Sequence, residues 1–198
     1  MAVNQQAIDR LRLDEAFPEK MLHRAFRECW TVRCDERLLV VDDADTKVSH
    51  FGTPTDDAGE GLMVINENRR QIVLLSIDNQ LLKSVEGGVA DCALFDDSQF
   101  RFVEFKMNAE GKSDKAIEGT FEKATQQLKN TILLFKNRLQ ALDVDFEDAV
   151  TLRCHVVLSQ AFPATQSTMQ DIQLEFANET GIPLDFASKT HWEESEEK

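Results

Sequence analysis

A predicted β-hairpin near the middle of the chain constrains its fold more than any other feature. Two largely apolar runs, residues 93–95 and 100–103, flank a polar, aspartate-rich connection of four residues. This pattern is typical of two antiparallel strands joined by a short turn. Side chains alternate between the two faces of a strand, so Glu104 and Lys106 share one face while Phe105 lies on the other.

The strongest helical pattern follows this hairpin. Apolar side chains recur every three or four residues from Ile117 to Leu142, and Ser113 or Asp114 can cap the helix. Together with shorter patterns elsewhere, this order predicts an α/β fold with a central mixed β-sheet flanked by helices. The other expected elements are a helix at about 17–30, strands at 37–41, 62–66, 71–77, 149–159 and 184–186, a loop at 49–61 and a helix at 167–178.

Composition narrows the class of protein. Apolar residues make up 42% of the 198 residues, which is enough for one domain with a sizeable core. No apolar run approaches the roughly 20 residues that span a bilayer, and the N-terminal residues lack the apolar core of a signal peptide. We therefore expect a cytoplasmic protein without membrane association, with a single domain over residues 1–190 and an acidic, disordered tail at 191–198.

The predicted hairpin carries residues suited to phosphodiester hydrolysis. Carboxylates are the hard oxygen ligands that Mg²⁺ prefers, and Mg²⁺ lowers the repulsion between an anionic phosphodiester and its nucleophile. We expect Asp91 and Glu104 to bind the metal, together with the backbone carbonyl of Phe105. Lys106 would hold the attacking water or stabilise the charge that develops on phosphorus. Glycines at 87–88 would leave room for a backbone or a bulky substrate.

Asp91, Glu104 and Lys106, with Gly88 ahead of them, resemble the motif of the PD-(D/E)XK nuclease superfamily, which includes restriction endonucleases and Holliday-junction resolvases. Ala90 stands where the proline of the family's name would be. The order of expected elements is also similar to that family's common core. The resemblance implies a restriction-endonuclease-like core and Mg²⁺-dependent hydrolysis of DNA, or less favourably RNA, with Mn²⁺ able to replace Mg²⁺.

The resemblance also implies supporting residues and partners. Some members place a glutamine from the next helix near the site, where this chain has Gln126 and Gln127, and we take Gln127 as the site residue. Many members add a glutamate from the first helix, for which Glu19 and Glu28 are the candidates. A homodimer with one site per DNA strand and a separate targeting protein are further expectations.

The charge of the chain leaves a second function open. A formal net charge of −14 opposes binding to phosphates. Residues 101–140 hold eight Lys or Arg against five Asp or Glu, a local balance of +3 that could still contact a phosphate backbone. One alternative to the site is that Glu104 and Lys106 form only a surface pair on an exposed face of the hairpin. The alternative function is a catalytically inactive, acidic interaction or regulatory protein that retains the nuclease fold.

Overall fold

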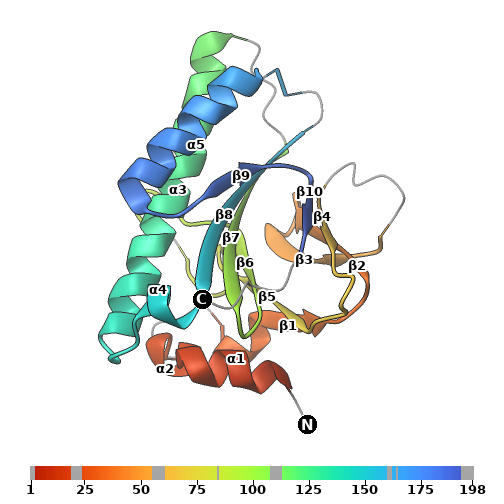
Figure 1. The fold of residues 1–198 in the computed structure, drawn as a ribbon, viewed down its shortest axis with the longest axis vertical. Helices are drawn as coiled ribbons and strands as arrows, with labels where there is room; N and C mark the ends of the chain where they lie inside the picture. Colours follow the sequence, from red (N-terminus) through yellow and green to blue (C-terminus); the bar gives the residue numbers. More distant parts are fainter. Residues whose placement is uncertain are drawn as a thin grey trace.

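The chain forms three layers, with helices on one side, a six-stranded sheet in the middle and a four-stranded sheet on the other side (Figure 1). The α/β class and the mixed sheet flanked by helices are thereby confirmed. None of the helices in the described part of the chain is long and apolar enough to cross a membrane. The computed structural model describes residues 3–18, 24–54, 61–83, 85–107, 113–159, 162–163 and 165–192.

The six-stranded sheet contains the predicted hairpin as its two central strands. Neighbouring strands are antiparallel from β1 to β7, whereas β7, β8 and β9 run parallel. Phe95 lies opposite Phe100 across the hairpin, which confirms the expected register of the turn. In spatial order the strands are β1 (Trp30–Arg33), β5 (Ile72–Ser76), β6 (Cys92–Phe95), β7 (Gln99–Lys106), β8 (Thr151–Leu158) and β9 (Leu184–Phe186).

Helices cover one face of this sheet around a cluster of aromatic rings. The ring of Phe135, from the long helix α3, lies 5.1 Å from that of Phe102 and 4.7 Å from that of Phe17. Ser113 caps α3 by accepting a hydrogen bond from the backbone N–H of Ala116, as expected. The helical elements are α1 (Val3–Leu11), α2 (Leu13–Ala16), η2 (Phe26–Glu28), α3 (Asp114–Gln140), α4 (Phe146–Ala149) and α5 (Gln166–Thr180).

The four-stranded sheet covers the opposite face, so β7 is buried on both sides. Arg101, 5% exposed, donates hydrogen bonds to the hydroxyl of Thr190 and the carbonyl of His191, at 2.7 and 2.9 Å, and its guanidinium lies over the ring of Trp192. These contacts attach the end of the described chain to the central strand. In spatial order the strands are β10 (Lys189–His191), β4 (Leu62–Ile65), β2 (Arg37–Asp43) and β3 (Val48–Gly52).

Two sequence predictions are wrong within the described residues. The helix expected at 17–30 is replaced, from residue 24 onward, by the short η2 and by strand β1; residues 19–23 lie outside the description. Ala25 has extended dihedrals, φ −59° and ψ 134°, which end any helix there. The loop expected at 49–61 contains strand β3, and residues 55–60 are not described. Helix α1 and strand β10 had no clear signal in the sequence, and the acidic residues from 193 onward are not described.

Two glycines provide a matched test of how backbone conformation limits substitution. A Cβ atom added to Gly119 or to Gly181 would meet no atom within 4 Å, so the two positions have equal space. Gly119 lies inside α3, whereas Gly181 ends α5 with a left-handed φ of 73°. We expect Gly119→Ala to raise the free energy of unfolding by about 0.5–1 kcal/mol and Gly181→Ala to lower it by about 1 kcal/mol, measured by urea denaturation. A stabilising Gly181→Ala would contradict this account.

Candidate active site

The structure brings Asp91 and Glu104 next to each other at the open end of the hairpin. Cys92 pairs with Val103, so the adjacent Asp91 lies beside Glu104 and Phe105. The Asp91 Oδ2 atom accepts a 2.6 Å hydrogen bond from the backbone N–H of Phe105. The position of Asp91 is therefore fixed by the strand that carries the second carboxylate.

Lys106 connects the second carboxylate to helix α3. Its ammonium donates hydrogen bonds to Glu104 Oε1 and, at 2.8 Å, to Gln127 Oε1. The Gln127 amide in turn donates to the carbonyl of Val89 at 3.0 Å. Gln126 instead donates to Asn130 on the helix surface. Of the two candidate glutamines, Gln127 is thus the one in contact with the motif lysine.

Helix α3 also holds the segment that leads into Asp91. The Thr131 hydroxyl accepts a 2.7 Å hydrogen bond from the backbone N–H of Ala90, and the Asn130 amide donates to the carbonyl of Gly88. Gly88 has φ +76°, and a Cβ there would lie 3.0 Å from Gln127. The positive φ and the close approach of Gln127 both favour glycine at this position, where the segment packs on α3.

Burial and like charge destabilise the ionised forms of both carboxylates. Burial, followed by the charges of Glu104 and Asp42, holds the pKa of Asp91 well above its usual range. Burial raises the pKa of Glu104 to about 7, although Lys106 opposes the shift. Glu104 is 1% exposed, and its Oε2 atom has no hydrogen-bond donor among the described residues. A carboxylate oxygen in this state favours a nearby cation or proton.

Two further aspartates belong to this charged region and were not identified from the sequence. Asp42, at the end of β2 in the other sheet, accepts a 3.0 Å hydrogen bond from the Ser49 hydroxyl, and its charge acts on Asp91 and Glu104. Asp78 follows β5 and raises the pKa of Glu104 as well. Burial raises the pKa of both aspartates. In the sequence Asp42 is one of several acidic residues that follow a predicted strand. The carboxylates that it approaches belong to the other sheet, so nothing in the linear sequence distinguishes Asp42 from its acidic neighbours.

A cleft of about 380 Å³ opens the site at Lys106. Asp42 of β2 and Lys123 of α3 both line the cleft, whereas Asp91 and Glu104 are not among its lining residues. Lys129 and Lys136, farther along the helix, form ion pairs with Glu179 and Glu147. The residues around the cleft are Asp42, Ala44, Phe105, Lys106, Met107, Ala116, Gly119, Thr120 and Lys123.

The two carboxylates and the backbone carbonyl at the site are oxygen donors of the kind that Mg²⁺ prefers. Within the described residues, no three His, Cys, Asp or Glu side chains are placed to hold a metal together. Asp91, Glu104 and the Phe105 carbonyl would supply oxygen ligands, with water completing the coordination that Mg²⁺ requires. Glu28 is exposed on η2 and does not line the cleft, while Glu19 lies outside the described residues.

Comparison of the chain with models of protein families, with curated proteins and with solved structures gave no match. The function is therefore inferred from the geometry and electrostatics of the site itself.

The raised pKa of Glu104 predicts how stability depends on pH. A carboxyl group whose folded-state pKa exceeds its ordinary value of 4.5 contributes stability at low pH, and that stability is lost as pH rises through about 7. We expect the melting temperature of the protein in chelator to fall between pH 5 and pH 8, with a loss of up to about 3 kcal/mol from this group. Glu104→Gln should reduce the fall, and the exposed Glu67→Gln should not. Equal slopes for the two variants would refute the assignment.

Proposed function

We propose that this protein is a metal-dependent nuclease that hydrolyses phosphodiester bonds of DNA, with RNA the less favoured substrate. The observation that carries the proposal is the buried Glu104, whose Oε2 atom has no hydrogen-bond donor among the described residues. Glu104 lies beside Asp91 and contacts Lys106, which lines the cleft. A divalent cation would relieve the repulsion between the two carboxylates. The same cation would give the site a local positive charge that attracts an anionic substrate.

Each residue has a separate task in this proposal. When bound at this site, Mg²⁺ would supply Lewis-acid chemistry toward the phosphodiester and the attacking water. Asp91 and Glu104 provide carboxylate ligands, and the Phe105 carbonyl provides a third oxygen. Lys106 orients the attacking water or stabilises negative charge on the phosphoryl oxygens. Gln127 positions the Lys106 ammonium, since its amide joins that ammonium to the backbone at Val89.

The arrangement of elements supports a restriction-endonuclease-like core. The motif lies on the central hairpin β6–β7, and the next elements are the long helix α3, the parallel strand β8 and the helix α5. The four-stranded sheet is an addition to the core that the resemblance implies. A homodimer, with one site for each strand of DNA, and recruitment by a targeting protein are parts of the same proposal.

A second function is favoured by the net charge of −14. An acidic interaction protein that keeps the fold without catalysis would bind a basic partner, and that binding would weaken as salt is added. The two functions differ in whether the carboxylate pair binds metal.

Substitution of the motif residues tests catalysis directly. We expect Asp91→Asn and Lys106→Met each to lower the rate of Mg²⁺-dependent DNA cleavage by about 100-fold or more, because each removes a group that acts on the transition state. The exposed Lys115→Met serves as a matched control and should cleave at the wild-type rate. Cleavage is followed on labelled single- and double-stranded DNA, with circular dichroism to verify folding. Unchanged cleavage by both motif variants would eliminate the nuclease.

Calorimetry with Mn²⁺ separates the two functions without a substrate. A carboxylate must lose its proton before it binds metal, so Mn²⁺ should bind more weakly at pH 6 than at pH 8, in the direction set by the raised pKa of Glu104. Asp91→Asn should abolish the binding heat, and Glu67→Gln should preserve it. Heats that are absent from the wild-type protein at pH 8 would favour the acidic interaction protein.

A further inference from the structure

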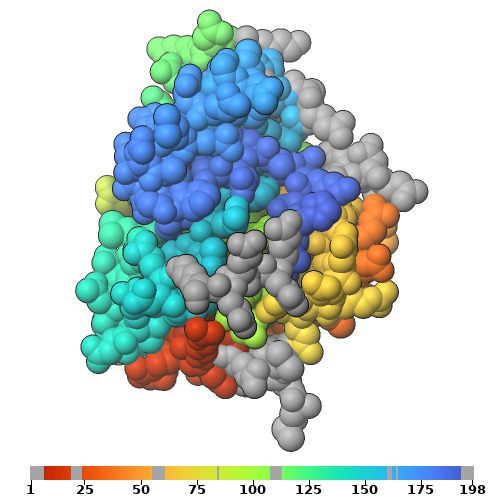
Figure 2. Space-filling model, in the orientation of Figure 1, coloured from red at the N-terminus to blue at the C-terminus, as the bar shows by residue number. Residues whose placement is uncertain are grey.

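A second, larger hollow lies between helices α3 and α5, on the other side of α3 from the proposed active-site cleft. It has a volume of about 980 Å³, near the upper end of the range of about 300–1,000 Å³ for ligand pockets. Several side chains of a partner could therefore enter it together. The two helices lie next to each other at the surface, where the first turns of α3 adjoin α5 (Figures 1 and 2).

The floor of this groove is apolar. Phe121 of α3 and Phe176 of α5 are buried beneath it, and the half-buried Ile117 and Ile172 lie between the helices. The Phe121 ring packs against that of Phe186, with the centroids 5.2 Å apart, so the floor continues into the core of the domain. This support gives the floor a fixed shape.

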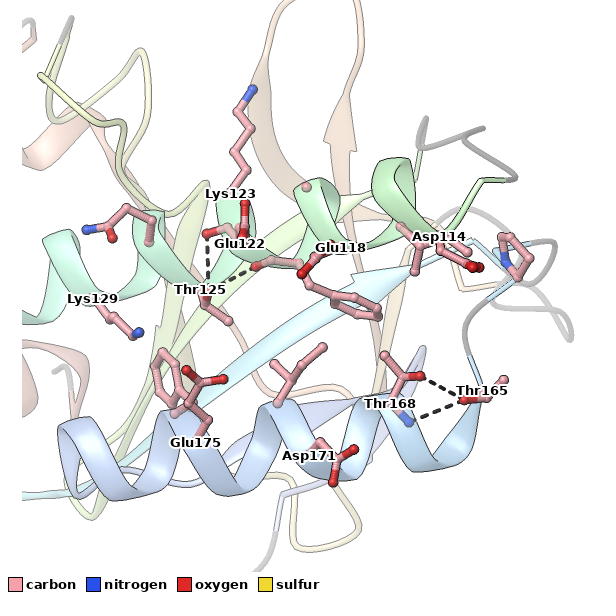
Figure 3. A pocket seen from close by; sticks show the side chains of 17 residues that line it. Asp114, Glu118, Glu122, Lys123, Thr125, Lys129, Thr165, Thr168, Asp171 and Glu175 are labelled. Atoms are coloured by element: carbon pink, nitrogen blue, oxygen red, sulfur yellow. Dashed lines mark hydrogen bonds between the residues drawn. The ribbon is translucent and has the colours of Figure 1, made fainter.

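The rim of the groove is acidic. Five exposed carboxylates line it, and none forms an ion pair with a described residue. Of the two lysines in the lining, Lys129 is paired with Glu179, and Lys123 points away from α5 (Figure 3). The rim therefore has a negative charge that nothing in the described chain neutralises. The carboxylates are those of Asp114, Glu118, Glu122, Asp171 and Glu175.

We propose that this groove is a docking site for a basic amphipathic segment of a partner protein. Apolar side chains of such a segment would fill the floor, and its lysines or arginines would face the five carboxylates. Nucleic acid does not fit, because its phosphates would meet the acidic rim. A second copy of this chain is also a poor occupant, since it has the same net charge of −14.

The groove and the active-site cleft share a wall. Gly119 and Lys123 of α3 line both hollows, so a bound segment would lie directly behind the helix that faces the cleft. Such a segment would also neutralise acidic charge close to the cleft, which otherwise repels an anionic substrate. Docking itself requires neither metal nor catalysis.

The test uses a defined probe, a fluorescein-labelled peptide of about 18 residues made of leucine and lysine in an amphipathic helical order. A peptide of the same composition, shuffled to remove the apolar stripe, is the control. Fluorescence anisotropy with the full chain, in the absence of DNA and metal, should show the ordered peptide binding at least about tenfold more tightly than the shuffled one. Equal affinity for the two peptides would overturn the proposal, because attraction to an acidic protein would then explain the binding.

Matched pairs of variants locate the site. The double variant Glu118→Lys, Glu175→Lys should weaken binding of the ordered peptide about tenfold or more. Glu67→Lys combined with Asp148→Lys changes the net charge equally at exposed positions outside the groove and should change affinity little. Equal weakening by the two double variants would contradict a site between the helices.

A second pair keeps the net charge constant. Ile172→Ala removes part of the groove floor, whereas Leu174→Ala, at a 64% exposed position on the same helix, leaves the floor intact. The first should weaken peptide binding about fivefold and the second should not. Peptide affinity that does not respond to Ile172→Ala would also overturn the proposal, and the result would leave the test of DNA cleavage unaffected.

Discussion

The burial of strand β7 on both faces determines where this protein can hold charge. Helices cover one face and the second sheet covers the other, so charged side chains on the strand must be paired or lie near its ends. Arg101 is paired with polar groups of Gln99 and of β10 near the start of the strand. Glu104 and Lys106 lie at its other end, where they bond to each other, and only Lys106 reaches the cleft. The position of the candidate site, at the end of β7, thus follows from the burial of that strand by the helices and by the second sheet.

The electrostatic character of the site follows from the two sheets together. The hairpin contributes Asp91 and Glu104, and the second sheet brings Asp42 close enough for its charge to act on both. Burial is the largest cause of the raised pKa of Asp91 and of Glu104, and repulsion from neighbouring carboxylates adds to it. In the proposed function, a bound cation would offset part of this local negative charge before an anionic substrate approaches.

Local patterns in the sequence predicted the elements whose stability is mostly local. Side-chain periodicity and turn chemistry predict the β6–β7 hairpin and the long helix α3. The same periodicity predicts that Glu104 and Lys106 lie on one face of their strand. The helix expected at 17–30 was predicted wrongly. Phe26 and Cys29 are spaced as on one face of a helix, yet they pack into the core through the single short turn η2 that precedes β1. Tertiary packing outweighed propensity at that point.

The features of the site that were not predicted depend on contacts between segments far apart in the sequence. The position of Asp42 depends on how two sheets stack, and no linear pattern encodes that. The choice between Gln126 and Gln127 did have a signal. Gln127 lies three residues after the buried Ala124 and four before the buried Thr131, on the side of α3 that faces the sheet.

The pairing of β10 with β4 has a consequence for how the chain reaches its native state. Lys189 lies opposite Met63, so the smaller sheet joins segments that are far apart in the sequence. Loop-closure entropy delays such contacts, and they form late relative to a hairpin or a helix. Until they form, the apolar face around Phe105 and Val103 is without the part of its cover that Trp192 provides. A newly synthesised or thermally stressed chain that exposes this apolar face is prone to aggregate through it.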